Sequence, residues 1–194
     1  MSDDDVTRRE FMETAGVVAA SLPWLAASPA GAQDAGPIID GASDVSMVVN
    51  GEPRTARIAP NMTLLDTLRE ELDLTGTKKG CNQGGCGACT IWIDGERANA
   101  CMTLAIMHEG REITTIEALA NGDDLHPLQR AFIENDAFQC GFCTSGQIMS
   151  GVKVLEEGLP ATEAGLTEAM NGNICRCSAY PQIRAALRDV AGKG

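Results

Sequence analysis

The sequence predicts an α+β protein made of two successive small domains, and three observations carry this prediction. Within residues 45–120, short apolar stretches alternate with Gly-containing turns, as is typical of strands. Within residues 121–194, apolar residues recur every three or four positions, as is typical of helices. The eight cysteines fall into two groups, one in each region, so each domain is expected to hold its own site.

The first domain is predicted to be a small sheet with one helix. Strands are expected at residues 46–49, 52–58, 90–93, 98–104 and 112–116. Asn50-Gly51 joins the first two, and this dipeptide is favoured in tight hairpin turns. Residues 63–72 place leucines on one helical face, with Thr63 as N-cap. With a cysteine-rich loop at 76–89, this pattern suits a β-grasp, ferredoxin-like domain.

The second domain is predicted to contain four helices. Apolar residues mark them at 128–132, 148–155, 166–170 and 183–190. Thr144 and Gln147 are predicted to form a capping box at the start of the second helix, and Pro181 lies near the start of the fourth. Neither domain is large enough to have much of a core of its own, so a metal centre in each would help to hold the fold.

Residues 1–32 have the order of regions found in an export signal. Arg8-Arg9 is followed by an apolar run at 15–27 and by an Ala-x-Ala end at 30–32. The run is too short to cross a bilayer, which takes about 20 residues. The arginine pair resembles a twin-arginine signal, which exports folded proteins, so we expect a periplasmic protein. Residues 33–44, rich in Gly, Pro and Asp, are expected to form a linker.

The net charge of −12 argues against nucleic-acid binding, which needs a basic surface. The eight cysteines leave three explanations: disulfides, zinc sites or iron–sulfur clusters. A signal for folded export weakens the disulfide explanation, because the chain folds before its thiols meet the oxidising periplasm. The two histidines, His108 and His126, lie outside both cysteine groups and are expected to be ordinary structural residues.

The first cysteine group has the spacing of a plant-type [2Fe–2S] ferredoxin. Cys81, Cys86 and Cys89 form C-x4-C-x2-C, and Cys101 follows after eleven intervening residues. Glycines within this loop allow it to curl tightly and let backbone N–H groups point at sulfur. Zinc sites prefer two C-x2-C pairs, so these four cysteines are predicted to ligate a [2Fe–2S] cluster.

The second cysteine group is less specific. Its members are Cys140, Cys143, Cys175 and Cys177. A C-x2-C pair with a C-x-C pair suits zinc as well as an iron–sulfur cluster, and C-x2-C alone can be a redox dithiol. Arg176 lies between two of the cysteines and either compensates the charge of a cluster or is an ordinary surface residue; the same alternatives hold for Lys78 and Lys79.

Motifs around both cysteine groups resemble the xanthine oxidase family of molybdenum hydroxylases. The stretches that carry the resemblance are residues 76–90, 139–144 and 172–177, with support at 63–70 and 99–101. The chain departs from the family pattern at Ser145, where Pro is usual, and at Ser178-Ala179, where Thr-Gly is usual. With the export signal, the closest resemblance is to the iron–sulfur subunits of periplasmic aldehyde oxidoreductases.

The resemblance implies that the second cysteine group also holds a [2Fe–2S] cluster, and that Gln139 and Cys177 lie near the pterin. It implies an electron-transfer subunit of an oxidoreductase, without catalytic residues of its own. A molybdopterin subunit would oxidise aldehydes to carboxylic acids. Electrons would pass through the second-group cluster and then the first-group cluster to an FAD subunit of a heterotrimer.

Three alternatives remain open from the sequence. One is the relay subunit of a related hydroxylase that acts on N-heterocycles with a cytochrome acceptor. Another is a stand-alone ferredoxin-like carrier, although such a carrier would need only the first cysteine group. The third is a zinc-stabilised interaction module. The substrate pocket would lie on another chain, so the sequence does not name the substrate.

Overall fold

The computed structural model describes residues 41–193, which belong to one compact unit. The predicted signal at 1–32 and most of the predicted linker lie outside the described residues. The first strand begins at Ser43, inside the segment expected to be linker, because Ser43 already pairs with Ile58. Within residues 41–193, no helix is long and apolar enough to cross a membrane.

The first part of the described chain is a mixed sheet with the strand order β2-β1-β5-β3-β4. Its strands are β1 (Ser43–Val49), β2 (Glu52–Ile58), β3 (Thr90–Ile93), β4 (Glu96–Asn99) and β5 (Glu112–Thr114). β1 and β5 are parallel and the other neighbours are antiparallel. The hairpin predicted at Asn50-Gly51 is confirmed, since both residues have the positive φ of 55° and 80° that a tight primed turn needs.

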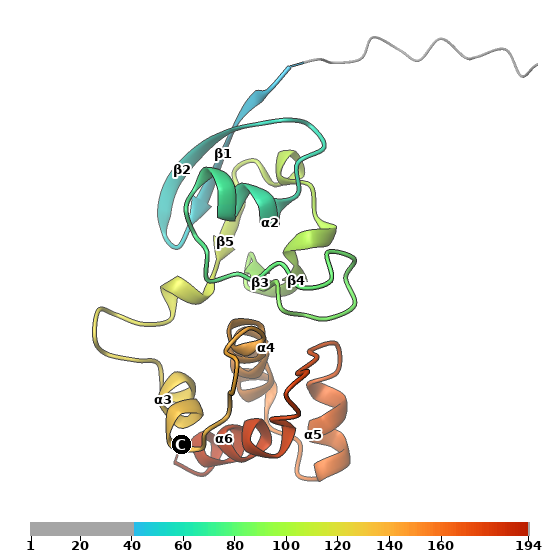
Figure 1. Cartoon of the computed structure of the whole chain (residues 1–194). Helices are drawn as coiled ribbons and strands as arrows, with labels where there is room; N and C mark the ends of the chain where they lie inside the picture. Colours follow the sequence, from blue (N-terminus) through green and yellow to red (C-terminus); the bar gives the residue numbers. More distant parts are fainter. Residues whose placement is uncertain (1–40, 194) are drawn as a thin grey trace, which may run out of the picture. The chain divides into compact units, whose positions relative to one another are not determined.

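A short helical segment packs against this sheet (Figure 1). It begins as α2 (Leu64–Asp66), where the hydroxyl of Thr63 accepts from the backbone N–H of Asp66 at 3.1 Å, as predicted for an N-cap. It then widens into a π-helix (Thr67–Glu71), in which the Leu72 N–H bonds to the Thr67 carbonyl. The prediction of one regular helix over 63–72 is therefore only partly right.

The return strand is shorter than predicted. β4 ends at Asn99, and residues predicted as strand up to 104 form the 3₁₀ turn Ala100–Met102, which buries Cys101. Further 3₁₀ turns cover Ala105–His108 and Ile116–Ala118. The chain thus turns away from the sheet edge to bring a cysteine inward.

The second part of the described chain is helical. Its helices are α3 (Pro127–Glu134), α4 (Thr144–Glu157), α5 (Glu163–Ala169) and α6 (Tyr180–Lys193). The capping box predicted at Thr144 is wrong, because Cys143 occupies the N-cap position and the Thr144 hydroxyl is buried without a partner. A capping box is instead formed by His126 and Gln129 at the start of α3.

Two groups of buried apolar residues support the two parts. One lies between the sheet and the α2 segment, and the other among the four α-helices from α3 to α6 in the described chain. Trp92 of β3 belongs to the helical core and its indole N–H donates to the carbonyl of Met149 in α4 at 3.0 Å. β3 therefore lies directly against α4 (Figure 1). The domain boundary at 120/121 stays a prediction.

Candidate metal centres

The loop that carries the first cysteines directs backbone N–H groups at sulfur. The N–H groups of Gln83 and Gly85 donate to the Cys81 sulfur at 3.4 and 3.3 Å. The N–H of Gly84 donates to the sulfur of Cys101 at 3.3 Å, across seventeen residues. Such donors stabilise the negative charge of thiolates, as the glycine content of the loop predicted.

Two glycines of this loop are required by its geometry. Gly87 has a φ of +66°, and a Cβ there would lie 2.3 Å from the carbonyl oxygen of Gly172. A Cβ on Gly80 would lie 2.7 Å from the sulfur of Cys86. By contrast, a Cβ on Gly85 would meet nothing within 4 Å. The loop is therefore closely packed at Gly80 and Gly87, and it has room for a side chain at Gly85.

The first four thiols meet in two pairs. The Cys81 N–H donates to the sulfur of Cys86 at 3.3 Å, and the thiols of Cys89 and Cys101 interact with each other. The hydrogen bond from the Gln83 backbone lowers the pKa of Cys81 to about 7, and burial raises the pKa of Cys89 to about 12. Ligation by Cys89 therefore requires a cation that displaces its proton.

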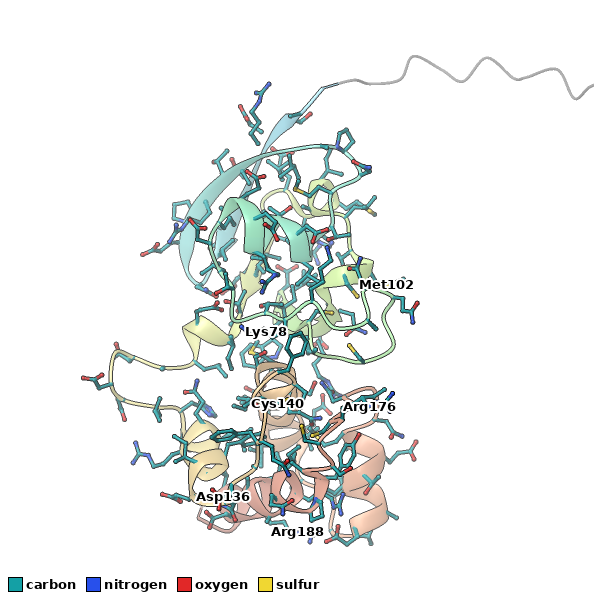
Figure 2. The ribbon with its side chains drawn as sticks, viewed as in Figure 1. Lys78, Met102, Asp136, Cys140, Arg176 and Arg188 are labelled. Atoms are coloured by element: carbon teal, nitrogen blue, oxygen red, sulfur yellow. The ribbon has the colours of Figure 1, made fainter. Side chains whose placement is uncertain are left out.

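The second four thiols also meet in two pairs, from the loops that lead into α4 and α6. Figure 2 labels Cys140 and Arg176, one residue on each of these two loops. Cys140 interacts with Cys177, and Cys143 interacts with Cys175. The backbone of Phe142 lowers the pKa of Cys140, whereas burial raises the pKa of Cys143 to about 12.

Two further hydrogen bonds fix the loop around Cys175. Its N–H donates to the Tyr180 hydroxyl at 2.9 Å, and its sulfur accepts from the N–H of Ala179 at 3.4 Å. Both partners lie next to each other at the start of α6, so the beginning of this helix holds the Cys175 side chain in place.

This pairwise arrangement fits a two-iron cluster. Within each group the two pairs also lie near each other, since Cys89 interacts with Cys86 and Cys143 interacts with Cys140. In a [2Fe–2S] cluster each iron takes only two protein thiolates, so two pairs of cysteines are the arrangement that it needs. Both cysteine groups therefore fit the cluster that the first group predicted.

A cavity of about 440 Å³ lies between the two cysteine groups. Its lining includes Cys81, Cys86, Cys140, Cys143 and Arg176. Arg176 is an exposed residue that lines this cavity (Figure 2), so it is placed where it could compensate the charge of a cluster, and the choice between this role and an ordinary surface role stays open.

The two lysines near the first group are engaged elsewhere. Lys79 pairs with Asp66 at 2.7 Å, and the Lys78 ammonium donates to the Thr75 carbonyl. The histidines have structural surroundings: His126 caps α3, and His108 lies beside Arg111 and Asp94. Their predicted ordinary roles agree with these contacts.

The structure brings Gln139 and Cys177 together, since the Gln139 amide donates to the Cys177 carbonyl at 3.4 Å. It also adds two residues to which the sequence assigned no role. The Asn173 amide donates to the carbonyl of Gly87 at 3.1 Å, and a Cβ on Gly146 would lie 2.1 Å from that same oxygen. The sequence signals for Asn173 were its position two residues before a cysteine and its place in the motif at 172–177, and neither indicated a contact with the first loop.

Comparison with known proteins decides the family. The domain described as "2Fe-2S iron-sulfur cluster binding domain" matches residues 47–114, and the "[2Fe-2S] binding domain" matches residues 115–188. The chain is 47% identical to the aldehyde oxidoreductase iron-sulfur-binding subunit PaoA of Escherichia coli strain K12, over 98% of this chain and 90% of that protein. The chain belongs to the family of iron–sulfur subunits of the molybdenum hydroxylases. It therefore carries two [2Fe–2S]-binding domains, and the resemblance seen in the cysteine motifs is confirmed.

Other members of this family extend the similarity. The nicotine 6-hydroxylase small subunit of Paenarthrobacter nicotinovorans is 45% identical over 77% of this chain and 90% of its own length. A chain in the crystal structure of quinoline 2-oxidoreductase from Pseudomonas putida 86 has a TM-score of 0.72 and 42% identity, covering 79% of this chain and 98% of that chain. The predicted α+β class with a β-grasp, ferredoxin-like first part is confirmed.

Proposed function

We propose that this chain is the electron-transfer subunit of a molybdenum-dependent aldehyde oxidoreductase. It relays electrons from a molybdopterin-binding subunit, which oxidises aldehydes to carboxylic acids, to an FAD-binding subunit of a heterotrimer. The observation that carries this proposal is the 47% identity to an aldehyde oxidoreductase subunit over 98% of the chain. That coverage takes in most of the first 32 residues, whereas the match to the nicotine 6-hydroxylase subunit covers 77% of the chain.

In this proposal all eight cysteines are cluster ligands. Each bound cluster accepts and releases one electron. The protein contributes the rest: cysteine pairs hold the thiolates, backbone N–H groups of Gln83, Gly84 and Gly85 stabilise sulfur charge, and Arg176 lies beside both groups. Gln139 and Cys177, which contact each other, are proposed to face the molybdopterin of the partner. No residue of this chain is proposed to be catalytic.

Purification of the native protein tests the assembly. We expect this chain to elute with a molybdopterin-binding chain and an FAD-binding chain, and to pass electrons from an aldehyde to an external acceptor only within that complex. A chain that elutes alone and shuttles electrons at full activity would instead be a stand-alone carrier.

A second candidate is the relay subunit of a hydroxylase for N-heterocycles. The 42% identity and the TM-score of 0.72 to a chain of quinoline 2-oxidoreductase favour it. The purified complex separates the two candidates, because the clusters of an aldehyde oxidoreductase are expected to be reduced by aldehydes and not by quinoline or nicotine. Reduction by the heterocycles, with transfer to a cytochrome, would favour the second candidate.

The proposed location is the periplasm, after export in the folded state. The support is the sequence around Arg8-Arg9, which resembles a twin-arginine signal. Replacing both arginines by lysine is expected to leave this chain and its partners in the cytoplasm, whereas Arg57→Lys, a change of an exposed side chain on β2, is expected to leave export intact. An unchanged periplasmic fraction for the double variant would contradict the proposed route.

A further inference from the structure

We propose that Asn173 is a positioning residue that fixes the distance between the two cysteine loops, and so sets the coupling between the two clusters. It is not a ligand and acts only through the loops that it joins. The inference rests on the function proposed above, because it takes each loop to hold a cluster.

The side chain of Asn173 reaches from the second cysteine loop to the first. Its amide nitrogen donates to the carbonyl of Gly87 at 3.1 Å and lies 3.4 Å from the hydroxyl oxygen of Thr90. The Thr90 hydroxyl donates to the same Gly87 carbonyl at 2.7 Å. Gly87 lies between Cys86 and Cys89, so these bonds hold the middle of the first metal-binding loop.

The backbone beside Asn173 makes a second connection. The N–H of Ile174, the residue before Cys175, donates to the carbonyl of Cys86 at 2.9 Å. The carbonyl of Asn173 accepts from the side-chain amide of Gln147 at 3.0 Å, and Gln147 is 2% exposed in α4. Asn173 is therefore anchored on one side by a buried helix residue and bonded on the other side to the first loop.

The two loops are closely packed around these hydrogen bonds. A Cβ on Gly87 would lie 2.3 Å from the Gly172 carbonyl oxygen and 2.5 Å from the Asn173 amide nitrogen. The Gly87 carbonyl also accepts from the N–H and the hydroxyl of Thr90, at 3.1 and 2.7 Å, so the bond from Asn173 is not needed to pair this oxygen and serves to join the two loops. An amide suits this position because it donates hydrogen bonds to oxygen acceptors.

The distance between the two loops affects the transfer of one electron between the clusters. In this transfer the second-group cluster would be oxidised and the first-group cluster reduced by one electron, and no proton or bond would move. The transfer rate and the magnetic interaction between two reduced clusters both fall as their separation grows. The magnetic interaction therefore measures directly what Asn173 is proposed to set.

Paramagnetic resonance of Asn173→Ala in the purified complex, reduced with dithionite, tests the proposal. We expect iron and sulfide contents equal to those of the unsubstituted protein, with a narrower magnetic splitting between the two cluster signals. The matched control is Asn171→Ala, whose exposed side chain makes no hydrogen bond to another described residue. The control is expected to keep the full splitting.

An unchanged splitting in Asn173→Ala, or an equal narrowing in both variants, would overturn the role of Asn173. If Asn173→Ala fails to retain iron, Gln147→Leu takes its place, since it removes the anchor and leaves the Asn173 amide intact. A narrower splitting is then expected, and the full splitting would overturn the role. Absence of two cluster signals in the unsubstituted complex would instead refute the proposed function.

Discussion

At the scale of single residues, two glycines of the first cysteine loop differ in the space available for a side chain. Gly80 faces the sulfur of Cys86, whereas Gly85, five residues further on, faces open space. Both keep a backbone N–H when changed to alanine, so any difference between the two variants reports steric fit alone. This pair therefore tests whether the loop is shaped around bound sulfur.

The change Gly80→Ala is expected to destabilise the loaded protein by about 1–3 kcal/mol, as overpacking does in a filled core. The physical reason is the Cβ that would lie 2.7 Å from a sulfur that the cluster holds in place. Thermal unfolding followed by the visible absorbance of the clusters measures the effect. Gly85→Ala is the control and is expected to unfold like the parent; equal losses in both variants would contradict this account.

At the scale of elements, α4 depends on a missing side chain near its start. Gly146 is buried, and a Cβ there would lie 2.1 Å from the carbonyl oxygen of Gly87 and 3.0 Å from the Cα of Ala88. Both neighbours are backbone atoms of the first cysteine loop and cannot rotate away. The helix therefore approaches this loop as closely as it does only because residue 146 is glycine.

Gly146→Ala is accordingly expected to reverse the usual effect of alanine in a helix. Alanine normally stabilises a helix interior by up to about 1 kcal/mol relative to glycine. Here we expect a loss of about 1–3 kcal/mol, because the added carbon forces two backbones apart. Gly192→Ala in α6, where a Cβ would meet nothing within 4 Å, is the control. A Gly146→Ala protein at least as stable as the parent in denaturant unfolding would refute the close contact.

The sequence predicted turns and helix caps correctly where these features depend only on residues close together in the chain. The Asn50-Gly51 turn and the cap at Thr63 depend on a few neighbouring residues, and both are present. The box expected at Thr144 failed because Cys143 precedes the helix in a loop shaped by its cysteines, which places Thr144 inside the first turn. The box at His126 escaped prediction because histidine is not among the preferred N-cap residues.

At the scale of the described chain, the two cores are joined by contacts that no local pattern reveals. Trp92 is part of β3 but packs among the helices, and its indole N–H donates to the carbonyl of Met149, 57 residues away. Asn173 and Gly146 likewise reach the first cysteine loop across more than fifty residues. The sequence predicted the eight cysteines as ligands from their spacing and the family resemblance, but not how their loops are held together.

Trp92→Phe is expected to lower the free energy of unfolding by about 1–3 kcal/mol, because it removes packing between the two cores and breaks a buried hydrogen bond. Chemical unfolding with both clusters in place measures it. Lys153→Gln is a useful comparison, because it removes the ammonium group 4.4 Å from the indole centroid and leaves the ring. That change also removes the ion pair of Lys153 with Glu156 at 2.7 Å, and it is expected to cost about 1 kcal/mol in total. A larger loss for Lys153→Gln than for Trp92→Phe would contradict the proposed importance of the ring.

The central claim is that the eight cysteines hold two [2Fe–2S] clusters. The most direct measurement is iron, zinc and acid-labile sulfide analysis of the purified complex, with paramagnetic resonance after dithionite reduction. We expect about four irons and about four sulfides per copy of this chain, and two distinct [2Fe–2S] signals. Zinc without sulfide, or one cluster signal with about two irons, would contradict it.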